Sequence, residues 1–167
     1  ARRAQAFHPA CITGVRRTVR SSDPAFTSIH AIAELDSVLP ETDLLVMALP
    51  STAETAGILS RERIALLPDS AFVVNVGRGT AIDQEALCDA LNAGQLAGAA
   101  LDVVVPEPLP ADHPLRRAKN LLLTPHVAGN MTLGYTCDKS VQMFCDDLEN
   151  YAAGRPLAHL VDRKRGY

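Results

Sequence analysis

The chain has 167 residues, 16 of them basic and 19 acidic, so its formal net charge is -3. With 47% hydrophobic residues, it has neither the basic excess of a nucleic-acid-binding domain nor the polarity of a disordered chain, and it should fold around an apolar core. Because no apolar run approaches the roughly 20 residues that cross a bilayer, and no signal-peptide pattern is present, we expect a globular, cytoplasmic protein without nucleic-acid or membrane partners.

Short apolar runs rich in β-branched residues alternate with segments of helical periodicity, which predicts an α/β fold with a parallel sheet and flanking helices. Six strands are expected, at residues 11–15, 28–30, 43–49, 71–76, 97–105 and 121–124. The run 43–49 is nearly all apolar and ends at a proline, which is typical of a strand buried on both faces.

Two helices are expected among these strands. Residues 83–94 begin with acidic side chains, carry apolar residues at helical spacing and end at Gly94, a common helix stop. Residues 132–153 carry the longest helical pattern. Its apolar stripe consists of Val141, Phe144, Cys145, Leu148 and Tyr151.

Three ionisable side chains, Arg78, Glu107 and His126, each follow the carboxyl end of a predicted strand. Ligands bind outside the carboxyl ends of the strands in open parallel sheets, so these groups could converge on one site. Taken singly, each has an ordinary alternative, because an arginine after a strand is more often a surface residue and a lone histidine is usually structural. The proline-rich segment 106–110 is expected to be a rigid loop.

Five short motifs follow one another along the chain: LPSTAET at 49–55, NVGRG at 75–79, GAALDV at 98–103, PEPLP at 106–110 and TPHVAG at 124–129. In order and spacing they resemble the D-isomer-specific 2-hydroxyacid dehydrogenases, and the resemblance covers essentially the whole chain. It implies a Rossmann-like, NAD(P)-binding fold. It also implies an oxidoreductase that transfers a hydride between NAD(P)H and a small 2-ketoacid or D-2-hydroxyacid.

The resemblance gives each ionisable group a role. Arg78 would bind the substrate carboxylate through two parallel charge-assisted hydrogen bonds. His126 would protonate the carbonyl oxygen as hydride arrives and deprotonate the hydroxyl in the reverse direction. Glu107 would hold the imidazole and favour its protonated form. A related formate-oxidising branch has a different residue at the glutamate position, so Glu107 favours a hydroxyacid substrate.

The resemblance also implies a set of coenzyme contacts. Asp102 matches a residue that accepts a hydrogen bond from the nicotinamide carboxamide, although an aspartate that merely ends a strand is an alternative. Arg16 and Arg17, after the first predicted strand, can accommodate a 2′-phosphate and favour NADP over NAD; alternatively, they stack on adenine and tolerate either coenzyme. The remaining contacts, mostly through backbone atoms, are Leu49, Pro50, Thr55, Val76, Gly77 and Gly129.

The family's phosphate-binding fingerprint, G-x-G-x-x-G, does not occur in this sequence. We therefore expect an N-terminally truncated fold, which by itself should be inactive as an enzyme. Residues 1–147 would form a partial dinucleotide-binding domain without its first strand and glycine loop, and residues 148–167 a tail that returns to a substrate domain. Because the first strand is central in the Rossmann order 3-2-1-4-5-6, a gap in the sheet is predicted.

The four cysteines form no C-x-x-C pair and no Cys/His cluster, so we expect a reduced protein without a metal site. Each lies in an apolar or helical stretch, where a thiol is usually buried as a small hydrophobic group. The positions are Cys11, Cys88, Cys137 and Cys145.

Family resemblance suggests a homodimer. Two other functional classes remain open besides the dehydrogenase. One is a dinucleotide-sensing, corepressor-like interaction protein of the same fold, and the other is a catalytically inactive fragment.

Overall fold

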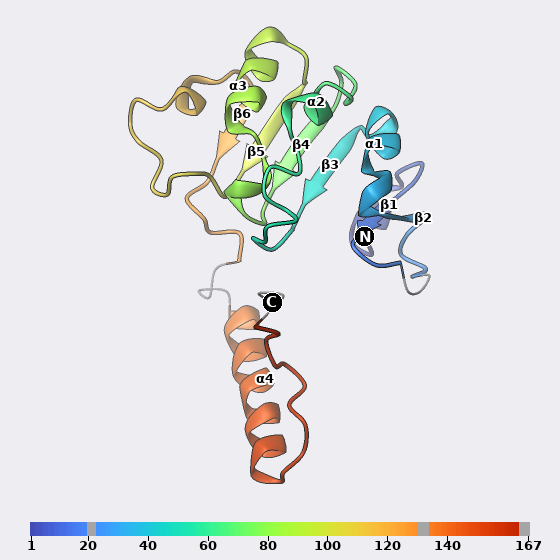
Figure 1. Ribbon diagram of the computed structural model, residues 1–167, viewed down its shortest axis with the longest axis vertical. Helices are drawn as coiled ribbons and strands as arrows, with labels where there is room; N and C mark the ends of the chain where they lie inside the picture. Colours follow the sequence, from blue (N-terminus) through green and yellow to red (C-terminus); the bar gives the residue numbers. More distant parts are fainter. Residues whose placement is uncertain (20–22, 130–133, 164–167) are drawn as a thin grey trace.

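The computed structural model describes residues 1–19, 23–129 and 134–163, and its strands form two parallel sheets (Figure 1). The first sheet pairs β1 (Thr13–Arg16) with β2 (Ser28–Ala31). The second contains, in spatial order, β3 (Leu44–Met47), β4 (Phe72–Asn75), β5 (Gly98–Leu101) and β6 (Leu121–Leu123). All six predicted strands are present and the parallel α/β fold is confirmed. The strand predicted at 97–105 is shorter than expected, because β5 ends at Leu101 and the chain then forms the loop that carries Glu107.

The two sheets are not joined by a strand ladder. Among the described strands, β1 pairs only with β2, and β3 pairs only with β4. The break therefore lies between the second and fourth strands of the Rossmann order, which is where the sequence predicts a gap.

The helices are α1 (Leu35–Val38), α2 (Arg61–Ile64), α3 (Gln84–Ala93) and α4 (Gly134–Ala152). Short 3-10 turns occupy Ala4–Phe7, Ile32–Glu34, Leu39–Glu41, Gly79–Ala81 and Pro114–Arg117. The limits predicted for α3 are confirmed. The Asp83 carboxylate accepts a hydrogen bond from the Ala86 N–H at 2.9 Å, and Gly94, with φ 74°, ends the helix. The start predicted for α4, at 132, lies outside the described residues.

The hydrophobic core lies on one face of the four-stranded sheet, under α3. Successive side chains of a strand point to opposite faces, and one set is buried, including Met47, Val73 and Leu101 together with Leu87 and Leu91 of α3. The other set is open to solvent: Leu44, Val46, Phe72 and Leu122 are 50–62% exposed. The prediction that 43–49 is buried on both faces is therefore wrong, because the described chain covers only one face of β3.

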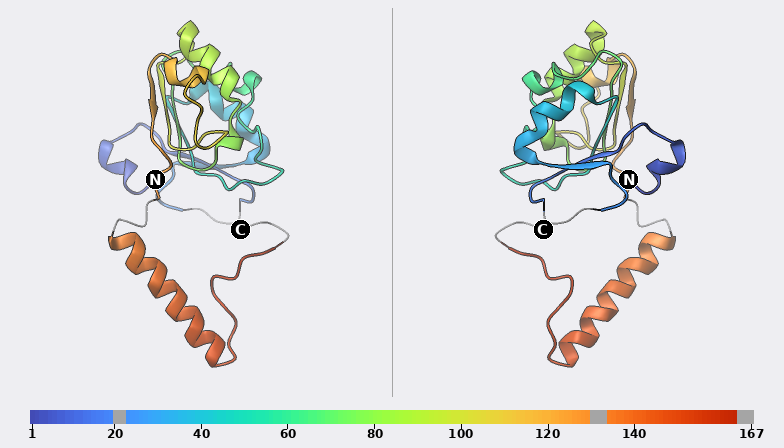
Figure 2. Two further views of the ribbon diagram at one scale, coloured as in Figure 1. Left: turned by 90° about the vertical axis from the view of Figure 1, so that its left-hand side faces the viewer. Right: turned by 90° about the vertical axis from the view of Figure 1, so that its right-hand side faces the viewer.

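The predicted apolar stripe of α4 has no partner in the described chain. Figures 1 and 2 show α4 projecting away from both sheets, and none of its residues is buried. Phe144 is 68% exposed and Tyr151 is 75% exposed. The chain after α4 turns back along it, with Asp147 accepting hydrogen bonds from the N–H groups of Ala158 and His159. No described helix is both long and apolar enough to span a bilayer.

Cysteine burial differs from the expectation. All four cysteines are described; Cys88 in α3 is buried, whereas Cys11 and Cys145 are exposed and Cys137 is partly exposed. The expectation is wrong for these three because Cys11 precedes a lightly packed strand and the other two lie on α4. In the part of the chain that the structure describes, no group of three or more His, Cys, Asp or Glu side chains could hold a metal ion.

Candidate active site

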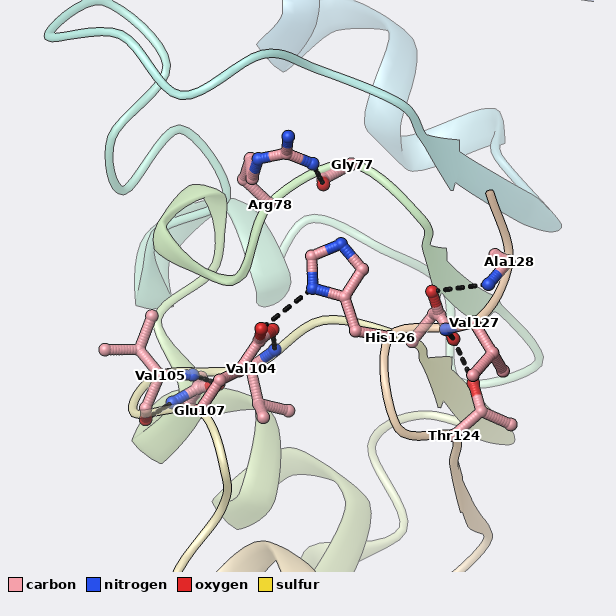
Figure 3. Close-up of polar contacts among 11 residues, drawn as sticks. Gly77, Arg78, Val104, Val105, Glu107, Thr124, His126, Val127 and Ala128 are labelled. Atoms are coloured by element: carbon pink, nitrogen blue, oxygen red, sulfur yellow. Dashed lines mark hydrogen bonds and ion pairs between the residues drawn. The ribbon is translucent and has the colours of Figure 1, made fainter. Parts of the chain in front are cut away.

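The structure brings the three predicted ionisable groups to one edge of the four-stranded sheet. Arg78 follows β4, Glu107 lies in the loop after β5, and His126 follows β6. All these strands are parallel, so their carboxyl ends meet at the same edge. Figure 3 shows the imidazole of His126 with one nitrogen at Glu107 and the other turned toward the side on which Arg78 lies.

His126 and Glu107 form an ion pair at this edge of the sheet. Nδ1 of His126 lies 2.8 Å from Oε2 of Glu107, and the Val104 N–H donates to Oε1 at 3.0 Å. The hydrogen bond with His126, followed by that from Val104, lowers the pKa of Glu107 below its ordinary value of 4.5. Glu107 is therefore ionised at neutral pH and accepts from a protonated Nδ1. Nε2 of His126 then remains for proton exchange with a ligand.

The loop that carries Arg78 is shaped by a buried asparagine. Asn75, at the end of β4, is fully buried; its Oδ1 accepts from the Gly77 N–H and its Nδ2 donates to the Arg78 carbonyl, both at 3.0 Å. The Arg78 side chain is exposed and its Nη1 donates to the Gly77 carbonyl at 2.7 Å. Sequence analysis assigned no role to Asn75. A polar residue closing an apolar strand is the signal that could have found it.

Asp102 holds the loop that carries His126. It is 6% exposed, and its carboxylate accepts from the Thr124 hydroxyl at 2.6 Å and from the N–H groups of Val127 at 2.8 Å and Ala128 at 2.9 Å. Burial raises the pKa of Asp102, but these three hydrogen bonds outweigh it and the pKa is lowered. The backbone carbonyl of Asp102 also accepts from the His126 N–H at 2.8 Å. This anchoring role was missed by sequence analysis, and the contact to a carboxamide stays a prediction.

The predicted coenzyme residues after β3 and β4 lie against each other. A Cβ on Gly77 would lie 2.6 Å from the Leu49 nitrogen, so the two backbones touch at a point that only glycine permits. The Thr55 hydroxyl donates to the Pro50 carbonyl at 2.6 Å and closes the loop after β3. Val76, beside them, is 42% exposed.

Gly129 lies beyond the loop of His126 in open space. A Cβ there would meet no described atom within 4 Å. Val76, which follows β4, is likewise exposed at the carboxyl edge of the sheet.

The two arginines at the end of β1 have different surroundings. The Arg16 guanidinium lies 5.2 Å from the centroid of the Phe26 ring, in cation–π range. Nη1 of Arg17 lies 3.9 Å from Oε2 of Glu54, in the loop after β3. Arg17 therefore faces the predicted coenzyme loop across the break between the two sheets, whereas Arg16 packs on its own sheet.

Comparison with known proteins matches residues 1–128 to the NAD-binding domain of the D-isomer specific 2-hydroxyacid dehydrogenases. Glyoxylate/hydroxypyruvate reductase A of Klebsiella pneumoniae (strain 342) is 40% identical over 148 residues, which is 89% of this chain and 46% of that protein. The same reductase of Salmonella newport (strain SL254) is 36% identical over the same shares. The chain thus spans about half the length of the curated relatives that it matches.

Two solved structures extend the match to nearly the whole chain. A D-isomer specific 2-hydroxyacid dehydrogenase from Xanthobacter autotrophicus Py2, in complex with NADPH and MES, is 34% identical with a TM-score of 0.86 and covers 99% of this chain and 66% of its own. An NADPH-dependent glyoxylate/hydroxypyruvate reductase from Sinorhizobium meliloti, in complex with NADP and sulfate, is 29% identical with a TM-score of 0.83, over 99% of this chain and 52% of its own.

Proposed function

Because the chain belongs to the D-isomer specific 2-hydroxyacid dehydrogenase family, we propose that it acts in hydride transfer between NADPH and a small 2-ketoacid. The names of its relatives favour glyoxylate and hydroxypyruvate as substrates. The observation that carries the proposal is the 2.8 Å contact between His126 Nδ1 and Glu107 Oε2 at the carboxyl edge of the sheet. A carboxylate that orients an imidazole in this way leaves one ring nitrogen for acid–base work.

The described residues fit the two ends of a dinucleotide. Arg17 is exposed after β1, where a 2′-phosphate would be recognised. Val76 is exposed after β4, and a Cβ on Gly129 would meet no described atom within 4 Å. The sequence carries no G-x-G-x-x-G loop for a pyrophosphate. The coenzyme, when bound, supplies the hydride.

The chain's own residues supply binding and proton transfer. Arg78 presents an exposed guanidinium that pairs with the ketoacid carboxylate and draws electron density from the adjacent carbonyl. His126 donates the proton of Nε2 to the carbonyl oxygen during reduction and accepts it back in oxidation. Glu107 stabilises the imidazolium that this requires, and Asp102 keeps the loop of His126 in place through the hydrogen bonds described above.

The proposal extends to the organisation of the chain. Residues 1–147 act as the coenzyme-binding part, and residues 148–167, of which 164–167 lie outside the described residues, act as a tail directed to a substrate-binding part. Homodimer formation and a cytoplasmic location stay predictions.

NADPH oxidation by the full-length protein with glyoxylate, hydroxypyruvate and pyruvate tests the function. We expect the full-length wild-type protein and the control His8→Ala, an exposed histidine before β1, to reduce at least one of these acids, and His126→Ala to reduce none at a comparable rate. Equal rates for wild type and His126→Ala, or no reduction by the wild type, would contradict the proposal.

A further inference from the structure

Gln84, which is not one of the three ionisable residues of the site, forms two hydrogen bonds with the loop that carries Glu107. Gln84 is the first residue of α3. Its Nε2 donates to the Val105 carbonyl at 2.6 Å, and its Oε1 accepts from the Val105 N–H at 2.9 Å. Gln84 thus satisfies both backbone groups of Val105, as a neighbouring strand would. This double contact fixes the backbone of Val105 relative to the start of α3.

The restraint lies next to the groups that orient Glu107. The residue before Val105, Val104, donates its N–H to Oε1 of Glu107, and Oε2 of Glu107 contacts Nδ1 of His126. A shift of the Val105 backbone would therefore move the donor that orients the carboxylate. The side chain of Glu107 is 38% exposed, so packing alone does not fix its rotamer and the hydrogen bonds to its carboxylate contribute.

The loop that carries Glu107 is also in contact with the loop that carries Arg78. A Cβ on Gly79 would overlap the backbone of Val104, so the two backbones are in direct contact. Gly79 begins the 3-10 turn that follows Arg78, and the chain then enters α3 at Gln84. The loops of Arg78 and Glu107 therefore meet at two adjacent points, one made by Gly79 and one by Gln84.

We propose that Gln84 is a positioning residue, which holds the Glu107 carboxylate on Nδ1 of His126 by fixing the backbone of Val105. The kinetic consequence rests on the proposed function, whereas the structural consequence does not. Without the Gln84 side chain, Glu107 leaves its single position and Nδ1 loses a fixed acceptor.

The direct test is the tautomer of His126 in Gln84→Leu. The ring nitrogen chemical shifts of His126, measured by nuclear magnetic resonance where the imidazole is neutral, report which nitrogen carries the proton. We expect the proton on Nδ1 in the wild type and in the control Gln95→Leu, an exposed glutamine beyond the other end of α3. In Gln84→Leu the shifts should move toward those of Glu107→Ala. Unchanged His126 shifts in folded Gln84→Leu would overturn the inference.

A graded variant keeps the test valid if Gln84→Leu folds poorly. Gln84→Glu retains an acceptor for the Val105 N–H but loses the donor to its carbonyl. Its His126 shifts should lie between those of wild type and Glu107→Ala. Shifts identical to those of the wild type would count against the inference.

Kinetics separate this inference from the proposed function. Misplacement of an acid–base group by a remote substitution costs roughly 10- to 100-fold in rate, so we expect Gln84→Leu to lower kcat by that factor with KM little changed, and Gln95→Leu to change neither. If the wild type reduces no 2-ketoacid while the His126 shifts still respond to Gln84→Leu, the proposed function fails and the positioning role stands. If the wild type is active but Gln84→Leu changes neither kcat nor the His126 shifts, the positioning role fails and the proposed function stands.

Discussion

The two sheets of this molecule differ in how firmly they hold their functional side chains. Around β3–β6, a continuous buried cluster underlies the loops of Arg78, Glu107 and His126, and each loop is held by hydrogen bonds of 2.8–3.0 Å. Among the described residues up to the end of β2, only Gly14 and Ala25 are buried. The groups proposed for proton transfer thus lie on the well-packed β3–β6 sheet, and the arginines proposed for coenzyme choice lie on the sparsely packed β1–β2 sheet. Substitutions in the two regions should differ in size and in kind.

The largest effect is expected where two backbones touch on the packed sheet. Gly79→Ala would place a Cβ into the backbone of Val104, and overpacking of this kind costs about 3 kcal/mol of unfolding free energy. Urea denaturation measures it. Gly129→Ala is the matched control, because a Cβ there meets no described atom within 4 Å. Equal stabilities of the two variants would show that the packed edge is looser than described.

Arg78 tests the chemistry of the same edge. Arg78→Lys keeps the charge but loses the planar fork that pairs with a carboxylate. We expect kcat/KM for the ketoacid to fall about 100-fold, which corresponds to about 2.7 kcal/mol, with NADPH binding little affected. Steady-state kinetics with glyoxylate and hydroxypyruvate measure this. A variant as active as the wild type would remove Arg78 from substrate binding.

Asp102 links stability to pH on this sheet. Its pKa in the folded chain lies below the ordinary value of 3.8, so the carboxylate stabilises the fold above that pH and loses its effect as the pH falls through the lowered pKa. Asp102→Asn places an amide group where the Ala128 N–H needs an acceptor, and it should lower the free energy of unfolding by about 2 kcal/mol near neutral pH. The loss of stability that the wild type shows below pH 3.8 should be smaller in the variant. Urea denaturation across pH, with the exposed Asp112→Asn as control, measures both effects. A variant with the wild-type pH dependence would contradict the anchoring role.

The smallest effect is expected on the sparsely packed β1–β2 sheet. Arg17→Ala should lower the preference for NADPH over NADH, as a ratio of kcat/KM values, by about tenfold, since exposed charge pairs contribute little. The free energy of unfolding should stay within about 0.5 kcal/mol of the wild type. The exposed Arg3→Ala serves as control. An unchanged coenzyme ratio would favour the alternative in which the arginines tolerate either coenzyme.

The positions of the strands and the limits of α3 were predicted well, because short apolar runs, the Asp83 cap and the Gly94 stop are local signals, although β5 is shorter than the apolar run that predicts it. The single turns α1 and α2 were missed, since four residues are too few to show a helical period. The family motifs predicted which residues gather at the sheet edge. The roles of Asp102 and Gln84 could not be predicted in the same way, because each acts on backbone groups that are distant in sequence and come near only after folding. Asn75 differs, because it acts on the neighbouring Gly77 and Arg78 and its place at the end of an apolar strand is a local signal. The open faces of β3 and α4 were also unpredictable, since an apolar pattern does not reveal whether a partner covers it.

The most direct test of the central assignment is the pH dependence of ketoacid reduction in Glu107→Gln. Because the pKa of Glu107 is lowered below 4.5, its carboxylate is ionised throughout the neutral range and stabilises the imidazolium of His126. We therefore expect kcat/KM to fall about 100-fold in Glu107→Gln throughout the neutral pH range, whereas the control Glu62→Gln, on the single turn α2, should keep the wild-type profile. A profile of Glu107→Gln that coincides with that of the wild type would contradict the assignment of His126 and Glu107 as the acid–base pair.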